Sequence, residues 1–192
     1  MPLLPAIAIP VIQSNLLSNN IKGIASIRLA TALANGFCSY SQSIIVNTID
    51  VGTIGSGSGI GFGVTLTPAQ LIKTLFDSFT ANSISGIFKQ RLILAIANSF
   101  SSLLTNSQIL TANVGVGAGT GKATLIPNSA LSISMMTTNF IAANLIGISG
   151  PKLARAVAQG YDLALPTAFG VVSITGGTGP SPGSGTGIGK LI

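Results

Sequence analysis

The sequence predicts an α+β fold made of three tandem helix–helix–β-hairpin repeats. A Gly-Ile dipeptide begins at residues 23, 86 and 147, and each copy is followed at the same offset by a basic residue and a leucine. Each copy then ends in a segment with glycine at alternate positions, namely Gly55–Phe62, Gly115–Lys122 and Gly183–Lys190. Self-similarity at a period of roughly sixty residues is typical of repeat proteins, in which neighbouring units bury one another's apolar faces.

These landmarks divide the chain into an N-terminal arm at residues 1–9 and three repeats. The repeats span 10–66, 67–126 and 127–192, and a Gly- and Pro-rich insertion at 176–183 lengthens the third. Pro10, Pro68 and Pro127 open them, and proline suits the first turn of a helix. We expect either a linear array or a closed pseudo-threefold ring, in which each helical hairpin covers its own strands.

Two helices are predicted in each repeat from apolar residues at helical spacing. In the first helix of the second repeat, Leu71, Leu75 and Phe79 share one face. Alignment of the copies places Ile12, Leu75 and Met136 at one position of the first helix, and Phe37, Phe100 and Tyr161 at one position of the second. The glycine of each Gly-Ile pair is expected in the turn between the helices or at the end of the first.

The β-hairpin of each repeat is predicted from a β-rich segment, the alternating glycines and a short apolar end. The β-rich segments are Ile44–Val51, Ile109–Val114 and Phe169–Thr175, and the apolar ends are Val64–Leu66, Ala123–Ile126 and Leu191–Ile192. Glycine at alternate positions leaves one face of an extended chain bare. We therefore expect the glycine segments to contact other units or subunits closely.

Charge is scarce: 47% of the residues are hydrophobic and 6% are charged, with nine Lys and Arg against three Asp and a net charge of +6. The basic residues are spread along the whole chain, whereas nucleic-acid-binding proteins usually cluster them, so the sequence does not favour nucleic acid as a partner. Neutral Ser, Thr and Asn make up the polar surface. Such a surface opposes association weakly, which favours a subunit covered by its neighbours.

The residue types needed for catalysis are missing or scattered. The chain has no His, and its carboxylates Asp50, Asp77 and Asp162 occupy three different positions of the repeat. Its single cysteine, Cys38, is expected to be a small buried hydrophobe. A phosphate loop ending at Lys122 would need Gly at position 116, where the chain has Val. The sequence predicts no enzyme activity and no catalytic, cofactor-binding or metal site.

One charged position recurs in all three copies, at Arg28, Arg91 and Lys152. These residues are either solvated at the start of the second helix or part of a threefold-repeated contact with an acidic neighbour or a helix C-terminus.

Membrane association is an alternative because the mean hydropathy is +0.69. The longest uncharged stretch, Leu92–Gly121, contains Asn, Ser, Thr and Gln throughout, so no window of about twenty residues is predominantly apolar. The proline-interrupted start of the chain lacks the basic region of a secretory signal. A membrane-associated or membrane-inserting repeat protein is therefore the second function to consider.

The tandem repeats ending in GVGAGTGK and GSGTGIGK, together with the low charge, resemble small virion structural proteins of tailed bacteriophages. The resemblance implies a non-enzymatic virion subunit in the tail, the baseplate or the capsid. Its partners would be other virion structural proteins and copies of itself, in a symmetric assembly.

Overall fold

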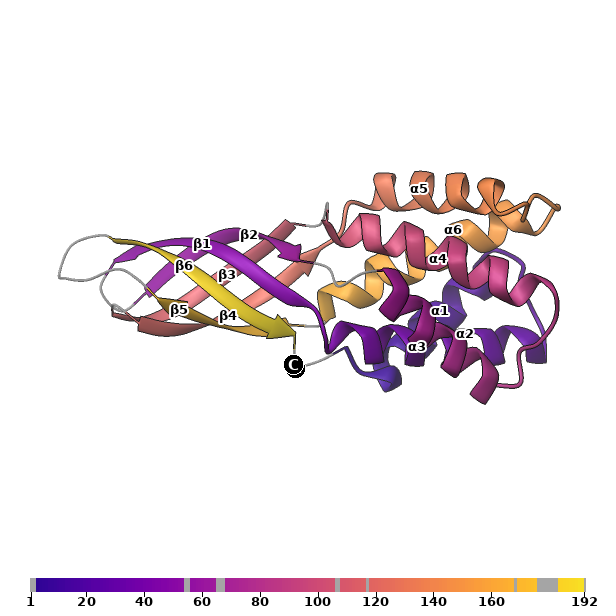
Figure 1. Ribbon diagram of the computed structural model, residues 1–192, viewed down its shortest axis with the longest axis horizontal. Coiled ribbons are helices and arrows are strands. Elements are labelled where there is room, and N and C mark those ends of the chain that lie inside the picture. The colour runs from indigo at the N-terminus through magenta and orange to yellow at the C-terminus, as the bar shows by residue number, and fades with distance from the viewer. Residues whose placement is uncertain are drawn as a thin grey trace.

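A computed structural model describes residues 3–53, 56–64, 68–105, 108–116, 118–167, 169–175 and 183–191, and it describes side chains over 3–44, 68–104 and 126–167. A helical body lies at one end of the molecule and a β-barrel at the other (Figure 1). The order helix, helix, strand, strand occurs three times along the described chain. Each repeat therefore contributes to both parts.

The helical body is a ring of six described helices. They are α1 (Pro5–Ser18), α2 (Ile24–Ser41), α3 (Pro68–Ala81), α4 (Phe88–Thr105), α5 (Ser129–Ala142) and α6 (Gly150–Ala164), the last followed by a 3-10 turn, η1 (Leu165–Thr167). Each helix packs against the next in sequence, and α6 packs against α1. The helices α1, α3 and α5 have the same length and begin at equivalent positions of the repeat.

Three aromatic rings, one from each second helix, meet in the core of this body. The Phe37 ring centroid lies 4.1 Å from that of Phe100 and 3.6 Å from that of Tyr161, and Phe100 and Tyr161 are 5.1 Å apart. All three side chains are buried. Because they are equivalent in sequence, their contact places the pseudo-threefold axis of the helical body between α2, α4 and α6.

The outer helices α1, α3 and α5 each bury one stripe of side chains against the inner helices. Ile12, Leu75 and Met136 are buried at equivalent positions one turn before Leu16, Phe79 and Phe140, which are buried as well. Two of the helix pairs are in close contact. A Cβ atom added at Gly36 of α2 would lie 2.7 Å from Leu75 Cδ2, and one added at Gly160 of α6 would lie 3.2 Å from Ile12 Cα.

The strands form a closed antiparallel barrel in which each pairs with its neighbours in sequence and β6 pairs with β1. They are β1 (Ile45–Thr53), β2 (Ser56–Val64), β3 (Gln108–Val116), β4 (Ala118–Ile126), β5 (Phe169–Thr175) and β6 (Gly183–Leu191). Pairs within a repeat alternate with pairs between repeats. A closed barrel has no free strand edge.

The alternating glycines are themselves strands, and not the lead into short strands as predicted. Gly59 of β2 is opposite Asp50 of β1 and Thr111 of β3, and Gly187 of β6 is opposite Thr48 and Ile174. The glycine segments do contact other repeats, through these ladders. Leu66, Ile192 and most of the insertion, residues 176–182, lie outside the described residues.

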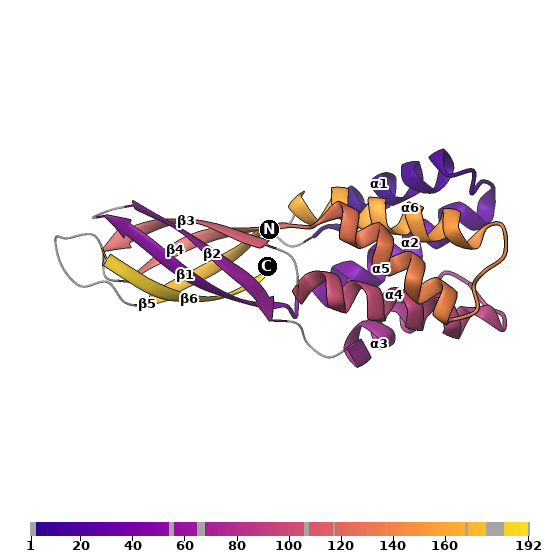
Figure 2. The same cartoon turned by 90° about the horizontal axis from the view of Figure 1, so that it is seen from above.

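The predicted α+β fold, with each helical hairpin covering its own strands, is wrong. The described core is helical: its buried residues come from the six helices, the 3-10 turn and the residues that flank them. Figures 1 and 2 show helices packed on helices, with the strands gathered beyond one end of the bundle. The apolar faces of all three hairpins converge on one shared core, so they are not available to cover a sheet.

The beginning of the first repeat also differs from the prediction. Helix α1 starts at Pro5, so residues 5–9 of the predicted arm belong to this helix. Pro10 lies inside the helix, whereas Pro68 is the first residue of α3 and Pro127 precedes α5. The proline equivalent to Pro68 is thus Pro5.

Candidate functional site

The end of the helical body opposite the barrel is formed by the three turns that join the helices of each pair (Figures 1 and 2). We call it the distal end. Asn20, Ser83 and Asn144 occupy equivalent positions in these turns with φ values of 64°, 58° and 56°. The amide that follows each of them donates to a carbonyl five residues earlier, as in Ile21 N to Leu16 O at 2.9 Å. These are Schellman caps, which end α1, α3 and α5 and direct the chain into the next helix.

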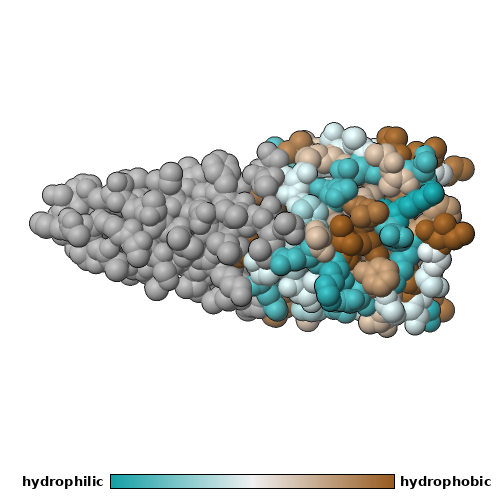
Figure 3. All heavy atoms as spheres, viewed as in Figure 1, coloured by the Kyte–Doolittle hydropathy of each residue, from teal (hydrophilic) through white to brown (hydrophobic). Residues whose placement is uncertain are grey.

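Each turn exposes one isoleucine almost completely. The tip isoleucines are Ile24, Ile87 and Ile148, and 73%, 84% and 89% of their surfaces are exposed. They are repeat equivalents, and no other large hydrophobic residue with a described side chain is as exposed. Gly23 and Gly86 precede two of them with φ values of 92° and 119°, a backbone conformation that favours glycine. Figure 3 shows apolar side chains among polar ones at this end, and a further apolar group on the side of the helical body.

A basic residue follows each tip isoleucine four residues later. These repeat cations are Arg28, Arg91 and Lys152, all exposed and all near the start of an inner helix. The structure therefore places them at the distal end, behind the tip isoleucines. The positive end of a helix dipole does not attract cations, so the helices do not explain the recurrence of basic residues near their starts.

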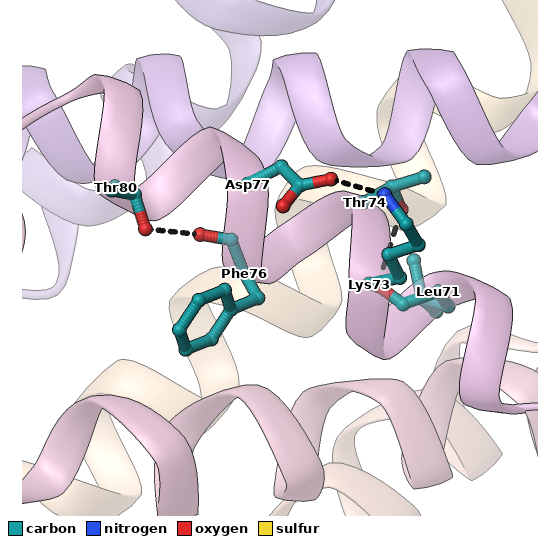
Figure 4. A network of polar contacts seen from close by, with 6 residues as sticks. All are labelled: Leu71, Lys73, Thr74, Phe76, Asp77 and Thr80. Atoms are coloured by element: carbon teal, nitrogen blue, oxygen red, sulfur yellow. Dashed lines mark hydrogen bonds and ion pairs between the residues drawn. The ribbon is translucent and has the colours of Figure 1, made fainter.

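Neither of the two carboxylates with described side chains lies in the distal turns. Asp77 accepts a hydrogen bond from Lys73 Nζ at 2.7 Å on the exposed face of α3 (Figure 4). Asp162 is buried in the last turn of α6, near the barrel. Asp50, the third acid of the sequence, lies in β1. The structure does not bring Asp77 and Asp162 together into a paired-carboxylate site.

Lys89, at the start of α4, reaches back over α3. Its Nζ donates to Thr80 Oγ1 at 2.6 Å and lies 4.1 Å from the ring centroid of Phe76. This cation is thus held against its own protein, unlike the repeat cations.

Asp162 differs from its repeat equivalents Cys38 and Ser101, and its burial was not predicted. Its Oδ1 accepts a hydrogen bond from Ser132 Oγ at 2.7 Å, while its buried Oδ2 has no hydrogen-bond partner among the described residues. Burial raises the pKa of the Asp162 carboxyl above its ordinary value, and the hydroxyls of Ser132 and Ser129 oppose this shift. Alignment of the three repeats could have indicated the burial of Asp162, because a residue equivalent to a buried cysteine is expected to be buried.

Cys38 is buried and free, in accordance with the role expected from the sequence. Burial raises the pKa of its thiol to about 12, so the thiol stays protonated and unreactive at neutral pH. Among the residues that the structure describes, no group of His, Cys, Asp and Glu side chains could hold a metal ion.

A groove of about 350 Å³ lies between α4 and α5. It is lined by Arg91, Leu94 and Asn98 on one side and by Asn139, Ala142 and Asn144 on the other. At this helix pair Ser99 replaces the glycine of the other two, Gly36 and Gly160. The Ser99 side chain is buried between these helices, with its hydroxyl 3.5 Å from Met135 O of α5.

The glycine segments that end in lysine do not form phosphate loops. Lys122 and Lys190 lie within β4 and β6, in register with strands on both sides. A phosphate loop needs free backbone amides in a turn before a helix, whereas the amides of these strands belong to β ladders.

Comparison of the chain with known protein families, curated protein sequences and solved structures finds no match. None of the described helices combines the length and the apolar character needed to cross a membrane. In the sequence, the tip isoleucines served only to mark the repeats. Each of them directly follows a turn glycine, and this recurrence is the pattern from which their exposure could have been inferred.

Proposed function

We propose that the protein is a non-enzymatic structural subunit of a virus particle, in the tail, the baseplate or the capsid of a tailed phage. It acts through protein contacts in a symmetric assembly. The observation that carries the proposal is ring closure, in the barrel through β1 and β6 and in the helical body through α1 and α6. One chain therefore presents the same arrangement of helices and strands three times around one axis.

Such a chain matches the surroundings of a rotation axis in a closed assembly. Symmetric oligomers repeat one surface around each axis, and a single asymmetric subunit on that axis would match only one of the repeats. A pseudo-threefold subunit contacts all three copies of the surface around a threefold axis, or every second one of the six copies around a sixfold axis. The low charge agrees with this role, because a surface that neighbours cover gains little from charges that keep free monomers dispersed.

The described acids and the thiol are engaged in contacts or buried. Asp77 is engaged in an exposed ion pair, Asp162 is buried, and the Cys38 thiol is protonated at neutral pH. The Ser132 hydroxyl donates to the Asp162 carboxylate, but both side chains are buried in the helical core.

Quantitative mass spectrometry of purified virions tests the proposal directly. We expect the chain among the structural proteins, at a small copy number for a tail or baseplate subunit and at hundreds of copies for a capsid subunit. Its absence from the particles would contradict the proposal.

The solution behaviour of the isolated chain provides a second test. Light scattering after size-exclusion chromatography is expected to show self-association, or poor solubility without partners. A stable monodisperse monomer at high concentration would count against a subunit that neighbours surround.

A further inference from the structure

We propose that the distal end is a binding site for an anionic membrane surface. The tip isoleucines insert among the lipids, and the repeat cations contact the phosphate headgroups. The inference goes beyond the proposed function and does not depend on it, since a subunit of any assembly could carry such an end.

The exposure of the tip isoleucines is the first argument. Exposed apolar residues are ordinary when they are scattered singly over a surface. Here the three most exposed large apolar side chains among those described share one position of the repeat and lie at one end of the body. Three turns around one axis form a tripod, which can meet a flat surface with all of its tips at once.

The depth of the repeat cations is the second argument. Each lies four residues after its tip isoleucine, which in α2, where both residues are helical, corresponds to about 6 Å along the helix axis. Side chains that bind membranes from the surface insert by about 5–10 Å into the region between headgroups and acyl chains. When the isoleucines are inserted, Arg28, Arg91 and Lys152 therefore lie at headgroup level, and their long side chains can reach the phosphates.

The sign of the charge is the third argument. Three helices end and three begin at the distal end, so their dipoles largely cancel and the side chains determine the potential. The basic side chains described there are Lys22, Arg28, Lys89, Arg91, Lys152 and Arg155, the last in the second turn of its helix. The nearest described carboxylate, Asp77, is already paired with Lys73. The distal end is thus cationic as well as apolar.

This charge decides among the candidate occupants. A second copy of the chain would bring two cationic ends together, which like-charge repulsion opposes. An acidic protein would satisfy the charge but would need pockets placed to receive three separate tips. A fluid lipid surface needs no such shape, and it accepts protruding isoleucines wherever they lie.

Binding of the full chain to lipid vesicles tests the inference. The probes are vesicles of phosphatidylcholine alone and vesicles of an equimolar mixture with phosphatidylglycerol, with binding measured by flotation. We expect binding to the mixed vesicles that weakens as salt is added, and little binding to phosphatidylcholine. Equal binding to both lipids, or to neither, would overturn the inference, and the second result would favour an acidic protein as the occupant.

Two triple variants assign the binding to the distal end. The first is Arg28→Gln, Arg91→Gln and Lys152→Gln, which is expected to weaken binding about a hundredfold, since each cation near an anionic surface contributes roughly fivefold. The second is Ile24→Ser, Ile87→Ser and Ile148→Ser, expected to weaken it by more than about tenfold. Both sets are exposed, so the melting temperatures should stay near that of the parent chain.

Matched controls use residues of the same types away from the turns. Lys73→Gln combined with Asp77→Asn removes the exposed ion pair of α3 without changing the net charge. Leu163→Ser removes an apolar side chain of α6 that is 60% exposed. Both are expected to bind as the parent does. If the triple variants bind vesicles like the controls, the distal end is not the site, and the proposed assembly role is unaffected.

Discussion

Gly36 of α2 and Leu75 of α3 are in such close contact that a Cβ atom at residue 36 would lie 3.1 Å from Leu75 Cα and closer still to its side chain. The contact joins the first repeat to the second. At the equivalent place between the third repeat and the first, Gly160 lies against Ile12. Two of the three repeat interfaces thus depend on the absence of a side chain in the inner helix.

Gly36→Ala is therefore expected to destabilise the protein. Alanine gains about 1 kcal/mol in helix propensity over glycine, but overpacking a core costs about 1–3 kcal/mol. Because the Leu75 backbone limits how far the neighbour can move away, we expect a net loss in the free energy of unfolding, measured with urea. Ser39→Ala, on the exposed face of the same helix, is the control and should not lose stability. Equal stability of Gly36→Ala and the parent would show that α3 moves aside freely.

Asp162 gives the stability of the protein a pH dependence. Its pKa is raised in the folded state, so the folded protein holds this proton at pH values where the unfolded chain has released it. The contribution favours folding below the unfolded pKa, and it is lost as the pH rises through the folded pKa. Stability at neutral pH is therefore reduced by a buried carboxylate.

The variant Asp162→Asn should be more stable than the parent at pH 7, by about 1 kcal/mol, the low end of the cost of an unpaired buried polar group. Its advantage should shrink as the pH falls toward 4. Thermal unfolding at several pH values measures both effects. Equal melting temperatures of Asp162→Asn and the parent at every pH would contradict a raised pKa of Asp162 in the folded state.

Tyr161 carries a hydroxyl in the cluster of three aromatic rings, whereas its two repeat equivalents, Phe37 and Phe100, are phenylalanines. The hydroxyl is buried and has no hydrogen-bond partner among the described residues. We expect Tyr161→Phe to keep or raise the free energy of unfolding, by up to about 1 kcal/mol. Tyr161→Ala should lower it by about 3–5 kcal/mol, because it leaves a cavity at the axis. A marked loss in the phenylalanine variant would reveal a partner for the hydroxyl.

Ser83 has a positive φ in the cap of α3, where the other two turns have asparagine. The backbone of a serine is strained at a positive φ, whereas that of a glycine is not. Ser83→Gly should therefore stabilise the protein by about 0.5–1 kcal/mol. Ser85→Gly, two residues further along the same turn, is the control and should be neutral or destabilising. Melting temperatures of the two variants distinguish a local gain at the cap from a general effect of glycine.

Part of this structure could be predicted from the sequence, because the spacing of apolar residues along a helix indicates which face is buried against its neighbours. Leu71, Leu75 and Phe79 show the buried stripe of α3 directly, and alignment of the copies carries it to α1 and α5. The placement of the strands could not be predicted in this way. Glycines such as Gly59 and Gly187 have no side chain to indicate a buried face, and their partners in the barrel are set by the closure of all three repeats.

The candidate site was predictable in part. Arg28, Arg91 and Lys152 were recognised as a recurring position, but their surroundings depend on where the chain turns. The sequence placed the start of the first repeat at Pro10, because proline suits a first helical turn, whereas Pro5 has that role and Pro10 follows within the helix. The exposure of Ile24, Ile87 and Ile148 could have been inferred from their place after a turn glycine, whereas helical spacing alone does not show it.

Closure of the ring also has a consequence for unfolding. In an open solenoid the terminal repeats can fray while the middle holds, because each repeat depends only on the one beside it. Here the first and third repeats are neighbours, so the loss of any one exposes two strand edges and two helix faces at the same time. The three repeats are therefore expected to melt in one cooperative transition, although each is a separate unit of sequence.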